Sequence, residues 1–118
     1  MSTYGPRIAA LERRAERDSE QFVATDAGPD EAMAYLREGA GQAIWLYVEA
    51  RTGGRLVPFS EDEFESLERS MNCWLSLYAR CYGVDLDASF TIRQAAELLL
   101  ETRNIRDTAQ LLTAVPER

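Results

Sequence analysis

Carboxylates spaced one helical turn apart are the side chains of this sequence best suited to chemistry. Glu65 and Glu68 form one such pair in an acidic run, and Glu97 and Glu101 form a second pair later in the chain. Carboxylates on facing helices hold magnesium in the all-helical nucleotide pyrophosphohydrolases, because Mg²⁺ prefers oxygen ligands. One interpretation is therefore a carboxylate-dependent metal enzyme that uses these four residues.

A simpler interpretation, which we favour, is that these acids have a structural role. Acidic side chains in the first turn of a helix are stabilised by its dipole, and the run Ser60–Glu68 occupies that position in a predicted helix. The chain also has no lysine that could bind phosphates. We therefore predict no catalytic residue, no metal and no cofactor, and keep the hydrolase as an alternative.

Histidine and cysteine chemistry is largely excluded. The chain has no histidine, so Ser–His and Cys–His catalysis and histidine-ligated di-iron sites are impossible. Cys73 and Cys81 lie eight positions apart on one predicted helix, about 12 Å along its axis, which is too far for a disulfide. Two thiols cannot complete a zinc site within one chain, so we interpret both as small apolar residues.

Two loops resemble ion-binding motifs only in part. Asp85 and Asp87 begin like a calcium loop, but Phe90 stands where that loop needs a glycine. The stretch RTGGR, residues 51–55, follows a helix, whereas anions bind at helix N-termini. We predict that Gly53 ends the preceding helix.

The segment from Thr91 to Pro116 has the outline of a helix-turn-helix. Leu99 stands where the turn of such a motif needs glycine, and the second helix offers little basic charge. DNA affinity comes mainly from neutralising phosphates, and this segment has no net positive charge. We therefore keep a DNA-binding regulator only as a second alternative.

Capping signals and apolar spacing predict an all-α fold. Ser60 with Glu63 forms a capping box, and Thr91 with Gln94 forms a similar signal. Gly39 and Gly41 predict a kink, because glycine is a poor helix former. We expect one domain, residues 1–118, that is a bundle of about five helices: 6–23, 30–52 (kinked near the two glycines), 61–82, 92–103 and 108–114.

Apolar stripes suggest what the bundle does. Ile8, Leu11, Ala15 and Phe22 form a narrow stripe on the first helix, of the kind that docks on another helix. Docking within the chain and docking on a second molecule explain this stripe equally well. The leading hypothesis is a non-catalytic protein-interaction module that binds a protein, first of all itself, as a dimer.

Aromatic and aliphatic residues elsewhere are expected in the core. The run AIWLYV, residues 43–48, is apolar on every face and should be buried on several sides, with Trp45 packed inside. Asp107 is expected to cap the last helix, on which Leu111 is expected to face inward.

Composition points to a soluble cytoplasmic protein. The chain has 13 basic residues, all arginine, against 20 acidic ones, for a net charge of −7, and its longest apolar run is far shorter than the ~20 residues that span a membrane. No apolar signal segment is seen at the start, MSTYGPRIAALERR.

Two runs resemble a small all-helical protein family of halophilic archaea that has no assigned function. They are YVEARTGGRLVPF and YGVDLDASFTIRQAAELLLETRNIRDTAQLLTAVPE, which together with the lysine-free, acidic composition carry the resemblance. The resemblance implies a salt-rich cytoplasm. It brings no catalytic or binding residue with it.

Overall fold

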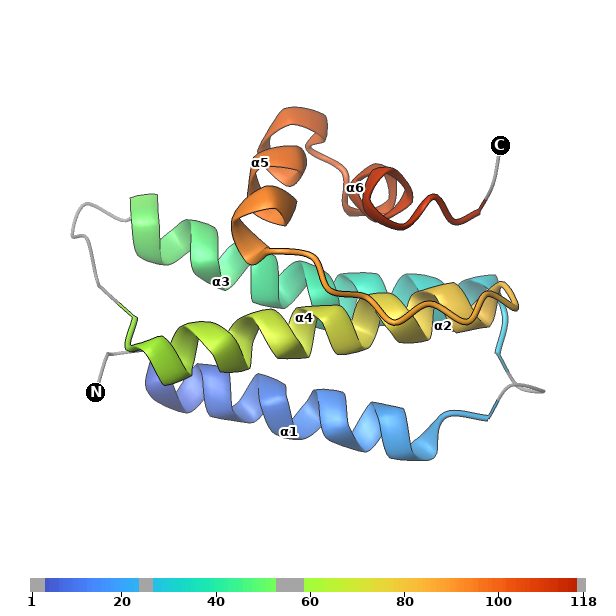
Figure 1. Ribbon diagram of the computed structural model, residues 1–118, viewed down its shortest axis with the longest axis horizontal. Helices are drawn as coiled ribbons and strands as arrows, with labels where there is room; N and C mark the ends of the chain where they lie inside the picture. Colours follow the sequence, from blue (N-terminus) through green and yellow to red (C-terminus); the bar gives the residue numbers. More distant parts are fainter. Residues whose placement is uncertain (1–3, 24–26, 53–58, 117–118) are drawn as a thin grey trace.

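Helices make up most of the chain, as the sequence predicted. The structure, a computed structural model, describes residues 4–23, 27–52 and 59–116 (Figure 1). The helices are α1 (Gly5–Gln21), α2 (Pro29–Ala34), a π-helical turn η2 (Tyr35–Ala40), α3 (Gly41–Thr52), α4 (Glu61–Cys81), α5 (Ile92–Thr102) and α6 (Ile105–Thr113). Because α2, η2 and α3 are continuous, the described residues form five helical bodies and contain no strand. None of the described helices is both long and apolar enough to span a membrane.

The central helix is α4, which lies between α1 and the α2–α3 helix in Figure 1. Its start is fixed by the predicted capping box: Glu63 N–H donates to Ser60 Oγ, and Ser60 N–H donates to the Glu63 carboxylate. From there, apolar residues recur at helical spacing and are fully buried: Leu67, Met71, Trp74 and Tyr78. Burying a side chain of this size contributes roughly 1.5–3 kcal/mol, so this face of α4 is the main source of stability.

Helix α1 packs lengthwise on α4 (Figure 1). The stripe residues Ile8, Leu11 and Ala15 are buried in this contact, and Phe22 is partly buried against the same core. The stripe therefore docks within the chain, which corrects the hypothesis that it serves as a docking surface for a second molecule. Polar contacts flank it, because Glu12 accepts hydrogen bonds from Ser66 and from Arg69.

The predicted kink near the two glycines is a π-helical turn. The Gly41 N–H donates to the carbonyl of Leu36, five residues back, which widens the helix at this point. Gly39 lies directly against the indole of Trp74, where a Cβ atom would come within 2.4 Å of the ring. The absence of a side chain at Gly39 thus lets α4 and η2 approach each other. Gly53, predicted to end this helix, lies outside the described residues.

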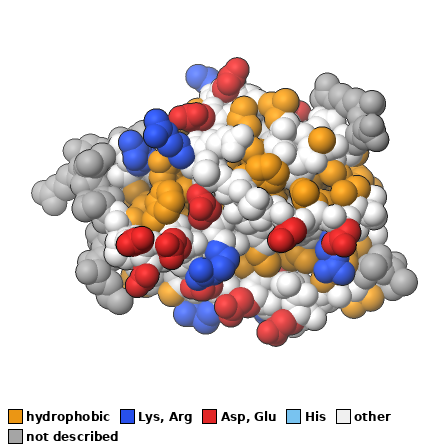
Figure 2. All heavy atoms as spheres, in the orientation of Figure 1, with side chains coloured by type: hydrophobic (Ala, Val, Ile, Leu, Met, Phe, Trp, Pro, Cys, Tyr) orange, Lys and Arg blue, Asp and Glu red, His pale blue; other side chains and the backbone are white. Residues whose placement is uncertain are grey.

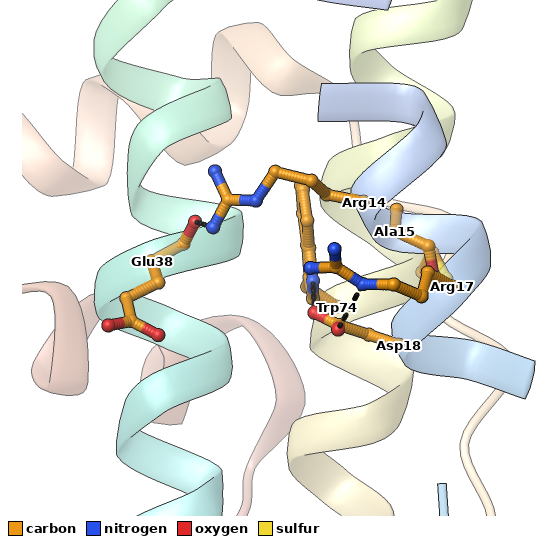
Figure 3. A network of polar contacts seen from close by, with 7 residues as sticks. Arg14, Ala15, Arg17, Asp18, Glu38 and Trp74 are labelled. Carbon is orange, nitrogen blue, oxygen red and sulfur yellow. Dashed lines mark hydrogen bonds and ion pairs between the residues drawn. The ribbon is translucent and has the colours of Figure 1, made fainter. Parts of the chain in front are cut away.

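A polar network holds the Trp74 ring in place (Figure 3). The Trp74 indole N–H donates to Asp18 at 2.9 Å, and the Arg14 guanidinium lies 5.9 Å from the ring centroid. Arg14 also donates to the carbonyl of Glu38, within the π-helical turn, at 2.7 Å. Residues of α1, η2 and α4 therefore meet around one indole.

Helices α5 and α6 form a hairpin across one side of the other helices (Figure 1). Arg103 takes a left-handed conformation (φ 55°) after α5, and Asn104 caps α6 by accepting from Asp107 N–H. The last helix therefore begins at Ile105, three residues before the predicted start at 108, because Asn104 and not Asp107 is the cap. The Tyr78 hydroxyl donates to the Val115 carbonyl at 2.6 Å and fixes the end of the hairpin to α4.

Candidate functional site

The four carboxylates of the metal-enzyme interpretation do not converge. Glu65 and Glu68 line a groove beside α4, whereas Glu97 lines a different pocket between α3 and α5, and Glu101 is exposed on α5. Glu97 forms an ion pair with Arg93 at 3.3 Å. Across the described parts of the chain, no three Asp, Glu, Cys or His side chains are grouped so that they could hold a metal ion. The metal-enzyme alternative therefore finds no shared site for these four residues in the part of the chain that the structure describes.

The groove beside α4 has a volume of about 490 Å³ and is lined mostly by polar and charged residues. Three α4 residues at successive turns, Glu68, Asn72 and Ser76, use their side chains to bind the backbone of the loop before α5 and of the first residue of α5. Glu68 accepts from Ile92 N–H at 2.8 Å, and Ser76 accepts from Ala88 N–H at 3.0 Å. These side chains are engaged in positioning the loop, so they act as structural groups.

Between Glu68 and Ser76 on α4, Asn72 binds the same loop through both polar atoms of its side-chain amide. Its amide oxygen accepts from the Phe90 N–H and its amide nitrogen donates to the Phe90 carbonyl, both at 2.9 Å. A single side chain thus satisfies both backbone groups of one loop residue. This contact fixes the start of α5, two residues further on.

The two cysteines are free thiols of low reactivity. Burial raises the pKa of Cys73, and burial likewise raises the pKa of Cys81. The Cys73 thiol contacts the Ala15 carbonyl at 3.5 Å. Because the thiolate is the nucleophilic form, raised pKa values keep both groups in the unreactive thiol state at neutral pH.

The α5–α6 hairpin retains the outline of a helix-turn-helix. Its second helix, α6, starts early enough to include Arg106, but Asp107 follows directly and both side chains are exposed. Thr108 and Ala109 face the core. The exposed side of α6 therefore carries balanced charge, and the DNA-binding alternative gains no basic face from it.

A second pocket, smaller but more enclosed than the groove beside α4, lies between α3 and α5 and is a candidate for binding another molecule. It has a volume of about 190 Å³ and an apolar floor made by Val48, Ala96 and Leu100. Its charged lining residues are Arg51, Arg93 and Glu97, and Tyr47 completes the wall. We call this the α3–α5 groove.

Two exposed apolar side chains lie in or next to this groove. Leu100, which lines the groove, is 52 % exposed, and Trp45, one turn before Val48 on α3, is 53 % exposed. In Figure 2, hydrophobic side chains reach the surface over α3 with arginine side chains beside them. An exposed tryptophan beside an apolar groove is the kind of surface that marks an interaction site.

Two arginines, Arg51 and Arg93, lie at the rim of the groove. The Arg51 guanidinium lies 5.6 Å from the centroid of the Tyr47 ring, so it is drawn to one wall. Arg93 is paired with Glu97 on the other wall, with both side chains largely exposed. Two arginines against one glutamate give this rim a net charge of about +1, on a chain whose net charge is −7.

The run 43–48 is buried on several sides as expected, but the expectation that Trp45 packs inside is wrong. Ala43, Ile44, Leu46, Tyr47 and Val48 are buried, but Trp45 faces solvent. A signal for this was present in the sequence: Gln42 and Glu49, one turn before and one turn after Trp45, are polar and mark the outward face. Leu111, also expected inside, is 63 % exposed on α6.

Comparisons with known proteins identify a family and no activity. A family model described as "Domain of unknown function (DUF8055)" matches residues 2–117. No curated protein and no solved structure matches the chain.

Proposed function

Since the chain belongs to the family described as "Domain of unknown function (DUF8055)", we propose its function from its own surface: it is a non-catalytic protein-interaction module that binds its partner at the α3–α5 groove. The observation that carries this proposal is the exposed Trp45 beside the apolar floor of the groove. Tryptophan is enriched at the energetic centres of protein interfaces.

The chemistry of the groove indicates what it binds. Its floor of Val48, Ala96 and Leu100 favours one apolar side chain, and burying such a side chain contributes roughly 1.5–3 kcal/mol. Arg51 and Arg93 at the rim favour carboxylates next to that side chain. The expected ligand is therefore a protein segment with an apolar residue flanked by acidic ones.

Selection from a displayed library of random peptides tests this proposal. The chain is immobilised at low density, so that copies do not meet, and peptides that carry an apolar residue beside acidic residues should be enriched. Leu100→Asp places a charge at the groove and should abolish the enrichment. Leu111→Asp is the matched control, because Leu111 is equally apolar and exposed but does not line the groove. No enrichment, or equal enrichment on the Leu100→Asp variant, would contradict the proposal.

We also propose that the module works in a salt-rich cytoplasm. Support comes from the lysine-free, acid-rich composition with a net charge of −7, because a surface of like charges is destabilised by self-repulsion that salt screens. Thermal unfolding should therefore shift to higher temperature as KCl is raised from 0.1 M to 2 M. An unfolding temperature that does not rise would contradict this assignment.

A further inference from the structure

We propose that the partner at the α3–α5 groove is a second copy of the same chain, related by a two-fold axis, with Trp45 of each copy seated in the groove of the other. This inference rests on the proposed function, because it names the occupant of the same groove. This dimer would bury the exposed indole of Trp45 and the exposed side chain of Leu100 on each copy.

The first argument is that the surface is complementary to itself. A two-fold interface uses the same patch on both molecules, so the patch must supply both a protrusion and a recess. Trp45 is the protrusion, and the groove floor at Val48 is the recess, only three residues away on α3. At about 1.5 Å per residue the two lie roughly 5 Å apart along the helix axis, so antiparallel α3 helices can bring each indole over the other groove.

The second argument is that the charges on the two walls also complement one another. One wall of the groove carries Arg51 and the other carries Glu97. A two-fold axis can therefore place Glu97 of one copy against Arg51 of the other, twice. The indole of Trp45 can in addition lie on the guanidinium of Arg93 or Arg51, since arginine stacks on tryptophan faces.

The third argument concerns the charge of the surface at which two acidic copies can meet. Two chains of net charge −7 repel each other over most of their surfaces. The rim of the groove, with two arginines and one glutamate, is a local exception. Self-association through the groove brings together lining residues that include two arginines and one glutamate on each copy, in place of the net negative surface of the chain as a whole.

Sedimentation equilibrium over a range of concentrations tests the dimer. We expect a mass near 26.6 kDa, twice the 13.3 kDa of the chain, that falls toward 13.3 kDa on dilution. Trp45→Ala should raise the dimer dissociation constant at least tenfold. Val84→Ala is the control, because Val84 is an exposed apolar residue in the loop after α4 that does not line the groove, and it should leave the constant unchanged.

Tryptophan fluorescence gives a second measurement that needs no destabilising variant. Trp74 is fully buried and Trp45 is half-exposed, so acrylamide should quench mainly Trp45. Dilution of the wild-type chain should increase the quenchable fraction as Trp45 leaves the partner's groove. Trp45→Phe provides the baseline from Trp74 alone and should show no change on dilution.

Salt distinguishes a second copy from a different, acidic partner. Raising NaCl screens the repulsion between two chains of charge −7, so the dimer dissociation constant should fall. An unrelated acidic partner attracted to the arginines would instead bind more weakly in high salt.

Several results would overturn the dimer. They are a mass of 13.3 kDa at every concentration, a dissociation constant that Trp45→Ala and Val84→Ala affect equally, or a quenchable fraction that does not depend on concentration. If the chain is a monomer at every concentration but still enriches peptides, and Leu100→Asp abolishes that enrichment, the second copy is not the partner. The proposed function then stands.

Discussion

Gly39→Ala is the substitution whose outcome depends most directly on the tertiary structure. Helix propensity alone predicts that alanine stabilises a helical position by up to about 1 kcal/mol relative to glycine. In the structure, however, the new Cβ atom would lie 2.4 to 2.6 Å from three atoms of the Trp74 indole. Carbon atoms in contact are normally about 3.5–4.0 Å apart, so the ring or the helix must move by roughly 1 Å.

The indole cannot easily move, because Trp74 is fully buried and is held by Asp18 and Arg14 (Figure 3). Overpacking of this kind typically costs about 1–3 kcal/mol, and a clash with three ring atoms belongs at the upper end. Subtracting the propensity gain leaves a net loss of about 2 kcal/mol. For 118 residues at about 2.1 cal/mol/K each, the unfolding entropy is roughly 250 cal/mol/K, so Tm should fall by about 8 °C.

Thermal unfolding followed by circular dichroism measures this loss. Gly28→Ala is the matched control: a Cβ atom there would meet only the flexible Glu31 carboxylate, at 3.4 Å, so the loss should stay below about 1 kcal/mol. A Tm for Gly39→Ala equal to or above that of the wild type would refute the reasoning. So would a double-mutant cycle in which Trp74→Ala, which removes the ring, leaves the cost of Gly39→Ala unchanged, since contacting residues should couple by about 0.5–3 kcal/mol.

Three further perturbations have defined outcomes. Asn72→Ala leaves both backbone groups of Phe90 without their partner and should cost about 1–3 kcal/mol in urea unfolding; a loss below about 0.5 kcal/mol would mean that water replaces the amide. Ser60→Ala removes half of the α4 capping box and should cost about 1 kcal/mol, whereas an unchanged urea midpoint would show that the cap is dispensable. Burial raises the pKa of Tyr78 from its ordinary 10 to about 12, so the neutral phenol is favoured in the fold, and the stability it contributes is present below pH 10 and lost as pH rises from 10 to 12. Tyr78→Phe should therefore flatten the loss of stability across that window, and an unchanged slope would assign the loss to other groups.

Local signals in the sequence determined the helices. The capping residues Ser60 and Thr91 set the starts of α4 and α5 where they were predicted, because a cap depends only on residues within one turn. The same kind of signal was misassigned once, at α6, since Asn104 and Asp107 are both good caps and only the chain geometry around Arg103 selects Asn104. The glycine pair likewise located the π-helical turn, though the indole of Trp74 that packs against Gly39 lies on another helix.

Only the tertiary structure decided which apolar faces are satisfied and which remain open. The stripe on α1 could dock on any helix, and it is the packing of α1 on α4 that buries Ile8 and Leu11. The run that contains Trp45 is itself apolar on every face, and only its polar neighbours Gln42 and Glu49 mark the outward side; the positions of α4 and α5 around α3 leave that indole in solvent. Apolar burial carries no direction of its own, and the partner of each face is therefore set by contacts between residues that are distant in the sequence.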